Sequence, residues 1–238
     1  MKLKLKLLII LSLASIFLSV AFYFISEITK NKNLVFPILK TSKTVGINQW
    51  FPKNVLGVES KGPEISAKAA FFVETKTGQI LYAKNIHERL SIASLTKIMT
   101  ALVALENKGL DDQILINELV TKVEPDNMEL LAGEKLTVKE LLYGIFLISA
   151  NDAAEALSQG IVIREEFIKM MNSKAKQLGM KDTYFANPIG LDEDNNTYST
   201  AFDLVLLSRY AIRNFPVLVD ISKLDHVLLP KTENHQDY

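Results

Sequence analysis

The hydrophobic pattern of the chain begins with an uncharged apolar run behind a short basic head. Three lysines lie within the first six residues, and residues 7–25 carry no charged side chain. This order is typical of an export signal, and the length of the run approaches the ~20 residues that span a bilayer. We therefore expect residues 1–30 to form an uncleaved signal anchor. A signal peptide cleaved near the small residues at 19–21 and a buried core helix are the alternatives.

The following stretch, residues 31–67, has scattered apolar residues and no sustained period of two or of 3.6. It contains Pro37, Pro52 and Pro63, which interrupt regular structure. We expect it to be a linker between the membrane and a folded part at residues 68–238. Basic residues before the apolar run favour a cytoplasmic start, which would place the folded part outside the cytoplasmic membrane, in the periplasm or at the cell exterior. If the signal is cleaved, the protein would be secreted.

Two short strand-like segments open the folded part. Residues 69–74 and 79–84 are rich in apolar and aromatic side chains, and the residues between them, 75–78, include a glycine suited to a tight turn. The pattern predicts a β-hairpin.

A largely apolar segment of strong helix formers follows at residues 94–106, and residues 107–109 supply its end. Ser94 therefore lies at or next to the N-terminus of a mostly buried helix, with Lys97 one turn further on. Positions three apart share a helix face, so the hydroxyl and the amine can meet. A serine hydroxyl is a weak nucleophile until a base removes its proton, and a lysine serves as that base when burial lowers its pKa from ~10.4. The helix N-terminus adds backbone N–H groups near a developing oxyanion.

The Ser-x-x-Lys pattern is weak when it stands alone. Residues 173–176 match it too, but they belong to a lysine-rich polar segment, for which a solvated helix face is the expected structure. For Ser94, the alternative is a helix-capping serine followed by an exposed lysine.

A second apolar helix is predicted at residues 136–148, and it runs directly into a polar segment that contains Ser149 and Asn151. The break puts a hydroxyl and a carboxamide at the junction of two buried helices, where polar groups need partners. In the alternative interpretation, Ser149 caps the second of these helices and Asn151 bonds to backbone.

Composition narrows the chemistry. Acidic and basic residues number 27 each, so no net field attracts nucleic acid or an anionic membrane surface. The chain has no cysteine, and its three histidines, His87, His226 and His235, lack metal-ligand spacing. We therefore expect neither a metal nor another cofactor, and no nucleic-acid partner. What remains is chemistry by hydroxyls, amines, carboxylates and amides.

Further segments complete a pattern that spans residues 69–230. They are the Thr77-Gly78 turn and residues 93–100, 132–138, 149–154, 171–172, 178–183, 187–191 and 198–204. In these segments the chain resembles the penicillin-binding D-alanyl-D-alanine carboxypeptidases, which are relatives of the serine β-lactamases. The resemblance implies an α/β (α+β) fold of the β-lactamase/transpeptidase type, with an antiparallel sheet flanked by helices and a helical subdomain. It also implies a serine peptidase of the bacterial cell wall.

The resemblance implies a role for each polar residue of the two motifs. Ser94 would be acylated by the substrate carbonyl, and Lys97 would be its general base. Ser149 would relay a proton between Lys97 and the leaving amine, and Asn151 would hold the substrate amide. The implied partners are a peptidoglycan stem peptide that ends in D-Ala-D-Ala, β-lactam inhibitors and, through the N-terminal segment, the cytoplasmic membrane. One departure is Ala150, where these carboxypeptidases usually have glycine, and its methyl group is expected to narrow the site.

The third motif of this family, Lys-Thr-Gly on a strand after the Ser-x-Asn motif, has no match at the expected place. The Lys-Thr-Gly at residues 76–78 precedes Ser94 and falls in the predicted hairpin turn, and the Lys-Thr-Glu at residues 231–233 lacks the glycine. The sequence ends at Tyr238, so we expect a C-terminally truncated domain that lacks its C-terminal strands and leaves an unpaired apolar sheet edge. Loss of one oxyanion-hole donor slows catalysis roughly a hundredfold or more, so we expect this chain to be close to inactive.

Two other functions remain open. One is a serine β-lactamase, in which a glutamate after the Ser-x-Asn motif activates the deacylating water. Glu165 and Glu166 follow Asn151, but they lie in the approach to the predicted helix around Met171 and Asn172 and do not match the usual loop pattern. The other function is that of a non-catalytic, membrane-anchored protein that binds the cell wall.

Overall fold

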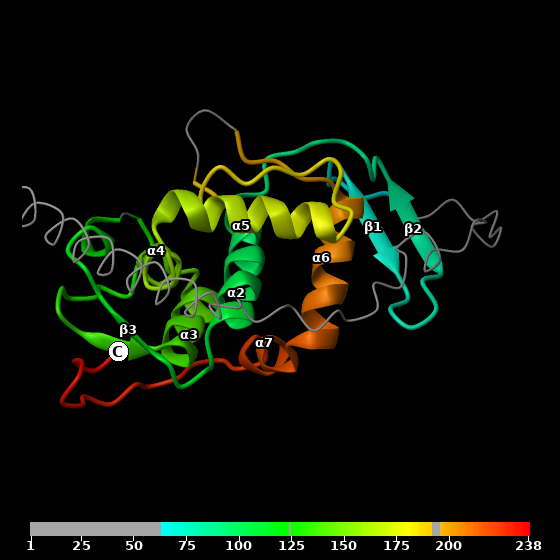
Figure 1. The fold of residues 1–238 in the computed structure, drawn as a ribbon. Helices are drawn as coiled ribbons and strands as arrows, with labels where there is room; N and C mark the ends of the chain where they lie inside the picture. The colour runs from blue at the N-terminus through cyan, green and yellow to red at the C-terminus, as the bar shows by residue number, and fades with distance from the viewer. Residues whose placement is uncertain (1–62, 124, 192–195) are drawn as a thin grey trace, which may run out of the picture. The chain divides into compact units, whose positions relative to one another are not determined.

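The computed structural model describes residues 63–123, 125–191 and 196–238 (Figure 1). The expected signal anchor and nearly all of the expected linker lie outside the described residues. Within the described ranges, no helix is both long and apolar enough to cross a membrane.

The predicted hairpin is confirmed. Strand β1, Ala70–Val73, pairs with strand β2, Ile80–Lys84, in antiparallel register. Gly78 in the connecting turn has a φ of +80°, a left-handed backbone that glycine adopts without strain. The Lys-Thr-Gly at residues 76–78 therefore forms the end of a turn, as the sequence indicated.

The hairpin packs against helix α6, Ala201–Asn214. The ring of Phe71 stacks on that of Phe202, with 5.9 Å between the ring centroids. Phe72 and Leu81 of the same hairpin are each 63% exposed. The hairpin is thus a two-stranded sheet that packs on α6 and leaves other large apolar side chains open to solvent.

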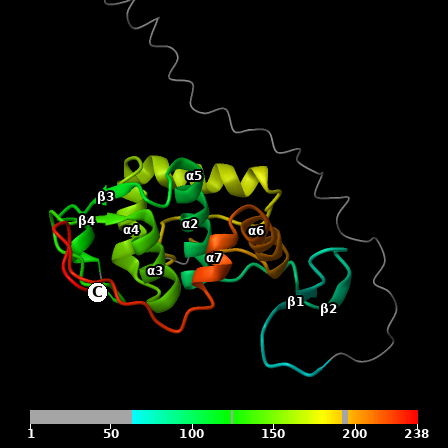
Figure 2. The same cartoon turned by 90° about the horizontal axis from the view of Figure 1, so that it is seen from below.

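Helix α2, Thr96–Asn107, lies at the centre of the helical part (Figures 1 and 2). The helices that contact it are α3, Val138–Ile148; α4, Asn151–Gln159; α5, Arg164–Gln177; and α6. A short helix, α7, Pro216–Ile221, packs on α3 and α6. Most of α2 is buried, including Met99 and Leu102 at its middle, because an apolar helix surrounded by others has no solvent face. The prediction of a mostly buried helix that ends near residue 107 is confirmed.

Helix α3 starts two residues later than the sequence predicted. Leu136 and Thr137 belong to strand β4, Lys135–Thr137, which pairs with β3, Gln113–Leu115. Thr137 then caps the helix: its Oγ1 accepts from Glu140 N at 3.2 Å, and Glu140 Oε2 accepts from Thr137 N at 2.7 Å. This reciprocal capping box fixes the helix start, so the prediction of helix from residue 136 is wrong.

The predicted break between two helices is confirmed. Helix α3 ends at Ile148, Ser149 adopts a left-handed backbone with φ of +59°, and α4 begins at Asn151. Two short 3₁₀ turns, Ala93–Leu95 and Val120–Lys122, complete the regular elements of the residues that the structure describes. Helices combined with small antiparallel sheets give the α/β class that the sequence predicted.

One lysine of residues 173–176, the second segment with the Ser-x-x-Lys pattern, is buried. Ser173 and Lys176 are exposed on α5, as a solvated face requires, but Lys174 is only 7% exposed. Its Nζ lies 2.8 Å from a Glu106 carboxylate oxygen of α2, and the Tyr210 hydroxyl of α6 donates to the same carboxylate at 3.0 Å. The expectation of a solvated helix face is therefore wrong for Lys174, which links three helices through one buried ion pair.

The C-terminal segment, residues 222–238, folds back beside β4 (red in Figure 2). Leu229 and Tyr238 exchange two backbone hydrogen bonds of 2.8 and 2.9 Å, and Lys135 N of β4 donates to Asn234 O at 3.0 Å. The Tyr238 hydroxyl also donates to Glu134. This segment thereby covers one side of α3 without forming a helix or strand of its own among the described residues.

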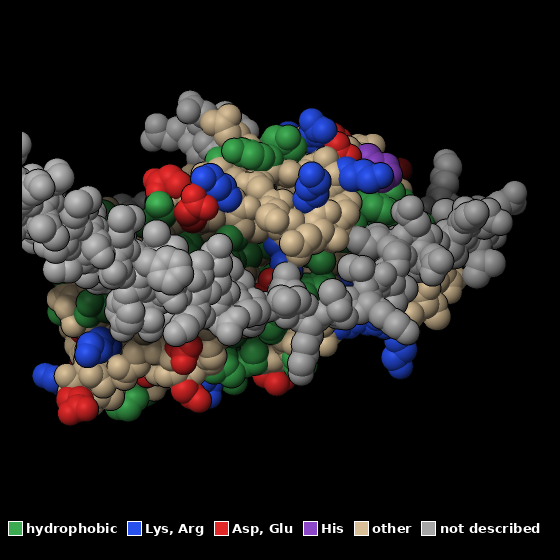
Figure 3. Space-filling model, viewed as in Figure 1, with side chains coloured by type: hydrophobic (Ala, Val, Ile, Leu, Met, Phe, Trp, Pro, Cys, Tyr) green, Lys and Arg blue, Asp and Glu red, His purple; other side chains and the backbone are tan. Residues whose placement is uncertain are grey.

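Basic and acidic side chains are mixed on the surface. Figure 3 shows both kinds interspersed on the face in view. Several form exposed pairs, such as Arg89 with Asp182 and Lys169 with Glu166, each at 2.6 Å. Exposed pairs contribute about 0–1 kcal/mol each, so they bear on solubility more than on stability.

Candidate active site

Ser94, Lys97 and Ser149 meet in a triangle of hydrogen bonds. Lys97 Nζ donates to Ser94 Oγ at 2.9 Å and to Ser149 Oγ at 3.2 Å, and Ser149 Oγ donates to Ser94 Oγ at 2.9 Å. The two serines are 55 positions apart in the sequence, so the fold brings the two predicted motifs together. Ser94 is exposed whereas Lys97 is 3% exposed. A reagent can therefore reach the hydroxyl while the amine stays behind it.

Burial shifts the acidity of the Lys97 amine. Removal from water lowers the pKa of Lys97 to about 8, and the negative charge of Asp126 acts in the opposite direction. A neutral amine can accept the proton of Ser94, so a pKa near 8 keeps part of the lysine in the form that a general base needs at neutral pH. The alternative interpretation, in which the lysine after Ser94 is exposed, is wrong.

The turn that presents Ser94 is fixed by a second turn packed on it. Ala93 has a left-handed backbone with φ of +45°. Gly190 packs directly on it: a Cβ at Gly190 would lie 1.9 Å from the Ala93 carbonyl oxygen. The Thr100 hydroxyl of α2 donates to Pro188 O at 2.6 Å and holds this second turn to the helix. The strained residue before Ser94 is thus held by its neighbours, as such residues must be.

Ser149 points toward Ser94 because of the break between α3 and α4. It is the residue directly after α3 and adopts a left-handed conformation, and α4 is preceded by Ala150 with no side-chain cap. The alternative in which Ser149 caps α4 is therefore wrong. Ala150 is fully buried, and its Cβ lies 3.4 Å from the place that a Cβ on Gly144 would take. Its methyl group packs against α3 and does not line open space, contrary to the expectation that it narrows the site.

Asn151 is 1% exposed and is turned toward the loop at residues 125–130. Its Nδ2 donates to Pro125 O at 2.6 Å, and its backbone N donates to Asp126 O at 2.7 Å. Its Oδ1 has no hydrogen-bond partner among the described residues. The interpretation that Asn151 bonds to backbone therefore holds for the amide nitrogen. The amide oxygen is a buried acceptor that a ligand N–H could satisfy.

Two carboxylates next to the site were not singled out by the sequence pattern. Asp152 is 1% exposed, and its side chain accepts from Met128 N at 3.0 Å and from Leu130 N at 3.1 Å. Asp126 raises the pKa of Lys97 from the same loop. Asp152 lies within the matched segment 149–154, which was the one available signal, but nothing in the sequence tied it to a loop more than twenty positions away.

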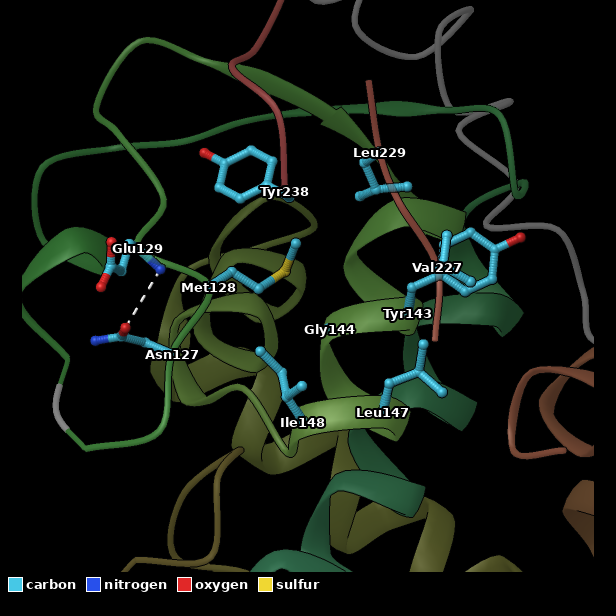
Figure 4. Close-up of a pocket in the computed structure, with 10 residues that line it drawn as sticks. All are labelled: Asn127, Met128, Glu129, Tyr143, Gly144, Leu147, Ile148, Val227, Leu229 and Tyr238. Atoms are coloured by element: carbon cyan, nitrogen blue, oxygen red, sulfur yellow. Dashed lines mark hydrogen bonds between the residues drawn. The ribbon is translucent and has the colours of Figure 1, made fainter. Parts of the chain in front are cut away.

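A cavity of about 260 Å³ lies on the side of α3 that the C-terminal segment covers (Figure 4). Met128 of the 125–130 loop and Leu147 of α3 point toward it. Ser94 and Lys97 do not line it, so it is separate from the triangle of hydrogen bonds. Its lining consists of residues 127–129, 143–144 and 147–148 with Val227, Leu229 and Tyr238.

Comparisons with known proteins agree on one family. The sequence profile of the family described as D-alanyl-D-alanine carboxypeptidase matches residues 57–236. The chain is 42% identical over 153 residues to the D-alanyl-D-alanine carboxypeptidase DacF of Bacillus subtilis (strain 168), with 62% of this chain aligned. Its structure is similar to the D-alanyl-D-alanine carboxypeptidase DacD of Francisella tularensis, with a TM-score of 0.70, 34% identity and 82% of this chain covered. It is also similar to a D-alanyl-D-alanine carboxypeptidase of Mycobacterium tuberculosis H37Rv, with a TM-score of 0.69, 28% identity and 79% covered.

The chain spans only part of these relatives. It covers 39% of the Bacillus subtilis protein, 48% of the Francisella tularensis chain and 70% of the Mycobacterium tuberculosis chain. The matched residues 57–236 include every residue of the triangle and the loop that holds Asn151.

We predict that Gly190→Ala destabilises the fold. The new Cβ would overlap the Ala93 carbonyl oxygen, and the φ of +84° at this position strains any side chain. We expect the free energy of unfolding, measured by urea denaturation, to fall by about 2–4 kcal/mol. Gly109→Ala is the control, because its nearest atom would be at an ordinary 3.6 Å. It should change the same quantity by less than about 1 kcal/mol, and equal effects of the two substitutions would refute the close packing.

Proposed function

Because the chain belongs to the D-alanyl-D-alanine carboxypeptidase family, we propose that it acts on peptidoglycan stem peptides as a serine-type D-Ala-D-Ala carboxypeptidase. The observation that carries the proposal is the triangle of Ser94, Lys97 and Ser149, with the lysine buried and the nucleophile exposed. The family resemblance drawn from the sequence is confirmed by the match over residues 57–236.

The distances suit an acyl-transfer reaction. Neutral Lys97 takes the proton of Ser94 Oγ as that oxygen bonds to the carbonyl carbon of the penultimate D-alanine. Ser149 Oγ, within hydrogen-bond reach of both, passes a proton from Lys97 to the nitrogen of the terminal D-alanine, and the C–N bond breaks. Free D-alanine leaves and an ester on Ser94 remains. Water then hydrolyses the ester and regenerates the hydroxyl.

Asn151 is proposed to bind the substrate rather than to react. Its Oδ1 is buried and lacks a partner among the described residues, so it is an acceptor suited to a peptide N–H. Its Nδ2 donates a hydrogen bond to Pro125 O, and this bond fixes the direction in which Oδ1 points.

We predict that a fluorescent penicillin acylates this chain at Ser94. The described residues supply the nucleophile, the base and the proton relay of the acylation step. Because the expected lack of one oxyanion-hole donor would slow this step roughly a hundredfold or more, labelling is followed over hours. Mass spectrometry of peptides should place the label on Ser94, and Ser94→Ala should abolish it. Ser173→Ala is the matched control, because Ser173 and Lys176 repeat the spacing at an exposed place on α5.

The same experiment separates the rival functions. A label that persists in Ser94→Ala would contradict the proposed nucleophile. No label on a folded chain, even after incubation for hours, would favour the non-catalytic wall-binding protein. An adduct that survives for hours supports the carboxypeptidase, and one lost within milliseconds supports a β-lactamase. Glu166, one of the two glutamates that follow Asn151, lies in the first turn of α5 and forms an exposed ion pair with Lys169.

We predict that acylation is controlled by the ionisation of Lys97. The burial of Lys97 lowers its pKa to about 8, so the charged, inactive form predominates below that pH and the neutral base above it. The second-order rate constant of penicillin acylation should rise with pH through a midpoint near 8 and then level off. Lys97→Arg should lower the plateau at least a hundredfold, because arginine does not lose its proton in this range. A rate that is independent of pH from 6 to 10 would contradict this role.

We also propose that residues 1–30 hold the protein at the cytoplasmic membrane with residues 68–238 on the extracytoplasmic side. The apolar run at 7–25 with its basic head supports this. We predict that the expressed chain sediments with membranes at its uncleaved mass, and that a chain lacking residues 1–30 stays in the soluble fraction. Deletion of residues 31–40 serves as the control and should leave sedimentation unchanged. Sedimentation of the chain that lacks residues 1–30 would contradict the anchor.

A further inference from the structure

The loop at residues 125–130 is held by the first turn of α4. Asp152 accepts hydrogen bonds from Met128 N through both carboxylate oxygens at 3.0 Å, and from Leu130 N at 3.1 Å. It also accepts from Ala153 N at 2.7 Å. No ion pair of Asp152 occurs among the described residues, so backbone N–H groups and the positive end of α4 stabilise its charge.

Burying the Asp152 carboxylate costs free energy of solvation. Two strained residues in the loop that it binds explain why a buried carboxylate is required there. Asp126 and Glu129 have left-handed backbones, with φ of +50° and +60°, although neither is a glycine. Such residues persist only when the surrounding structure determines their conformation. The two N–H groups that Asp152 binds lie between and just after these strained residues.

The same loop carries the groups that reach the active site. Pro125 O accepts from the Asn151 side chain at 2.6 Å, and Asp126 O accepts from the Asn151 backbone N at 2.7 Å. The Asp126 carboxylate raises the pKa of Lys97. A displaced loop would therefore move both the amide that is proposed to bind substrate and the charge that raises the pKa of the general base.

We propose that Asp152 is a positioning residue: by holding the 125–130 loop, it sets the orientation of Asn151 and the place of the Asp126 charge relative to Lys97. This role rests on the proposed function, because it acts on that reaction's base and substrate-binding amide.

Within the part of the chain that the structure describes, few groups act on the ionisation of Lys97 and Asp152. Around Lys97 the loop contributes Asp126, the turn before α2 contributes the neutral Ser94, and the α3–α4 break contributes the neutral Ser149. Around Asp152 the partners are the backbone N–H groups of the loop and of α4, and burial raises the pKa of Asp152. Among the described residues, Asp126 is the one charged group that shifts the pKa of Lys97, so a change in this pKa on alteration of Asp152 is expected to arise through Asp126.

The test compares Asp152→Asn with the unaltered chain in two measurements. The first is the pKa of Lys97 by NMR titration of its side-chain carbons, assigned with Lys97→Arg, which requires no acylation. We expect it to fall by about half a unit, because Asp126 moves away and its screened attraction is lost. The second is the plateau rate constant of penicillin acylation, for which we expect a loss of at least about tenfold as Asn151 shifts.

Asp126→Asn separates the effect of the Asp126 charge from the effect of the loop position. Asparagine tolerates the left-handed backbone as well as aspartate does, so the loop should stay in place. The pKa of Lys97 should fall by the same amount as in Asp152→Asn. The plateau rate should fall by less than it does in Asp152→Asn, because Asn151 keeps its place. In the double variant, no further fall in the pKa is expected, because both changes remove one interaction. Additive shifts would overturn the proposal.

Asp203→Asn is the matched structural control. Asp203 is also a buried carboxylate in the first turn of a helix, and it holds Asp182 N at 2.8 Å and the Thr183 hydroxyl at 2.7 Å. Its replacement should lower the thermal midpoint of unfolding without moving the pKa of Lys97. A lower thermal midpoint in Asp152→Asn with an unchanged Lys97 pKa and plateau rate would show a merely structural role and overturn the proposal.

Amide hydrogen exchange covers the case in which Asp152→Asn does not fold. In the unaltered chain the amides of Met128 and Leu130 should exchange slowly, and exchange as fast as at exposed loop amides would overturn the proposal. Failure of the proposed function is distinguishable, because absence of acylation in the unaltered chain leaves the Lys97 titration and the amide exchange as direct readouts of the loop.

Discussion

The structure depends on keeping the amine of Lys97 out of water and yet in contact with two hydroxyls. An ammonium group loses much of its solvation on burial, which is why its pKa falls to about 8. The partners that compensate come from different parts of the chain: Ser94 from the turn before α2, and Ser149 from the α3–α4 break. The arrangement requires that α2 be covered on nearly all sides, which the surrounding helices achieve.

The backbone at the α3–α4 break brings one of the two hydroxyls to Lys97. A continuous helix would point the side chain at position 149 along the helix surface, whereas the left-handed Ser149 turns it toward Ser94. Ending one helix and starting another within three residues leaves backbone and amide groups that need partners. The 125–130 loop supplies them, since Asn151 donates to Pro125 O and Asp126 O. The loop therefore belongs to the same active-site arrangement as Ser94, although it lies far from Ser94 in the sequence.

Local pattern was enough to predict the elements that carry the chemistry. The hairpin, the buried helix after Ser94 and the break before Asn151 follow from periodicity, helix formers and polar interruption, and each is confirmed. Features set by distant contacts could not be predicted in this way. Lys174 looks solvated in a polar segment, but Glu106 and Tyr210 from other helices bury it. The start of α3 was missed because β4 pairs with β3 up to the capping residue, Thr137.

The direction in which buried side chains point could not be predicted from the sequence either. Position 150 stands between Ser149 and Asn151, so its methyl group was expected in the site, yet the turn aims it at Gly144 of α3. Three of the residues with left-handed backbones, Ala93, Asp126 and Ser149, flank the site, and none is glycine. Glycine would relieve the strain but would give the turns more freedom in the unfolded and folded chain. Side chains at these places make the turns stiffer, provided that contacts from other elements hold them. The position of each reactive group then depends on packing at Gly190, Asp152 and Gly144, and this is why the site cannot be understood from its polar residues alone.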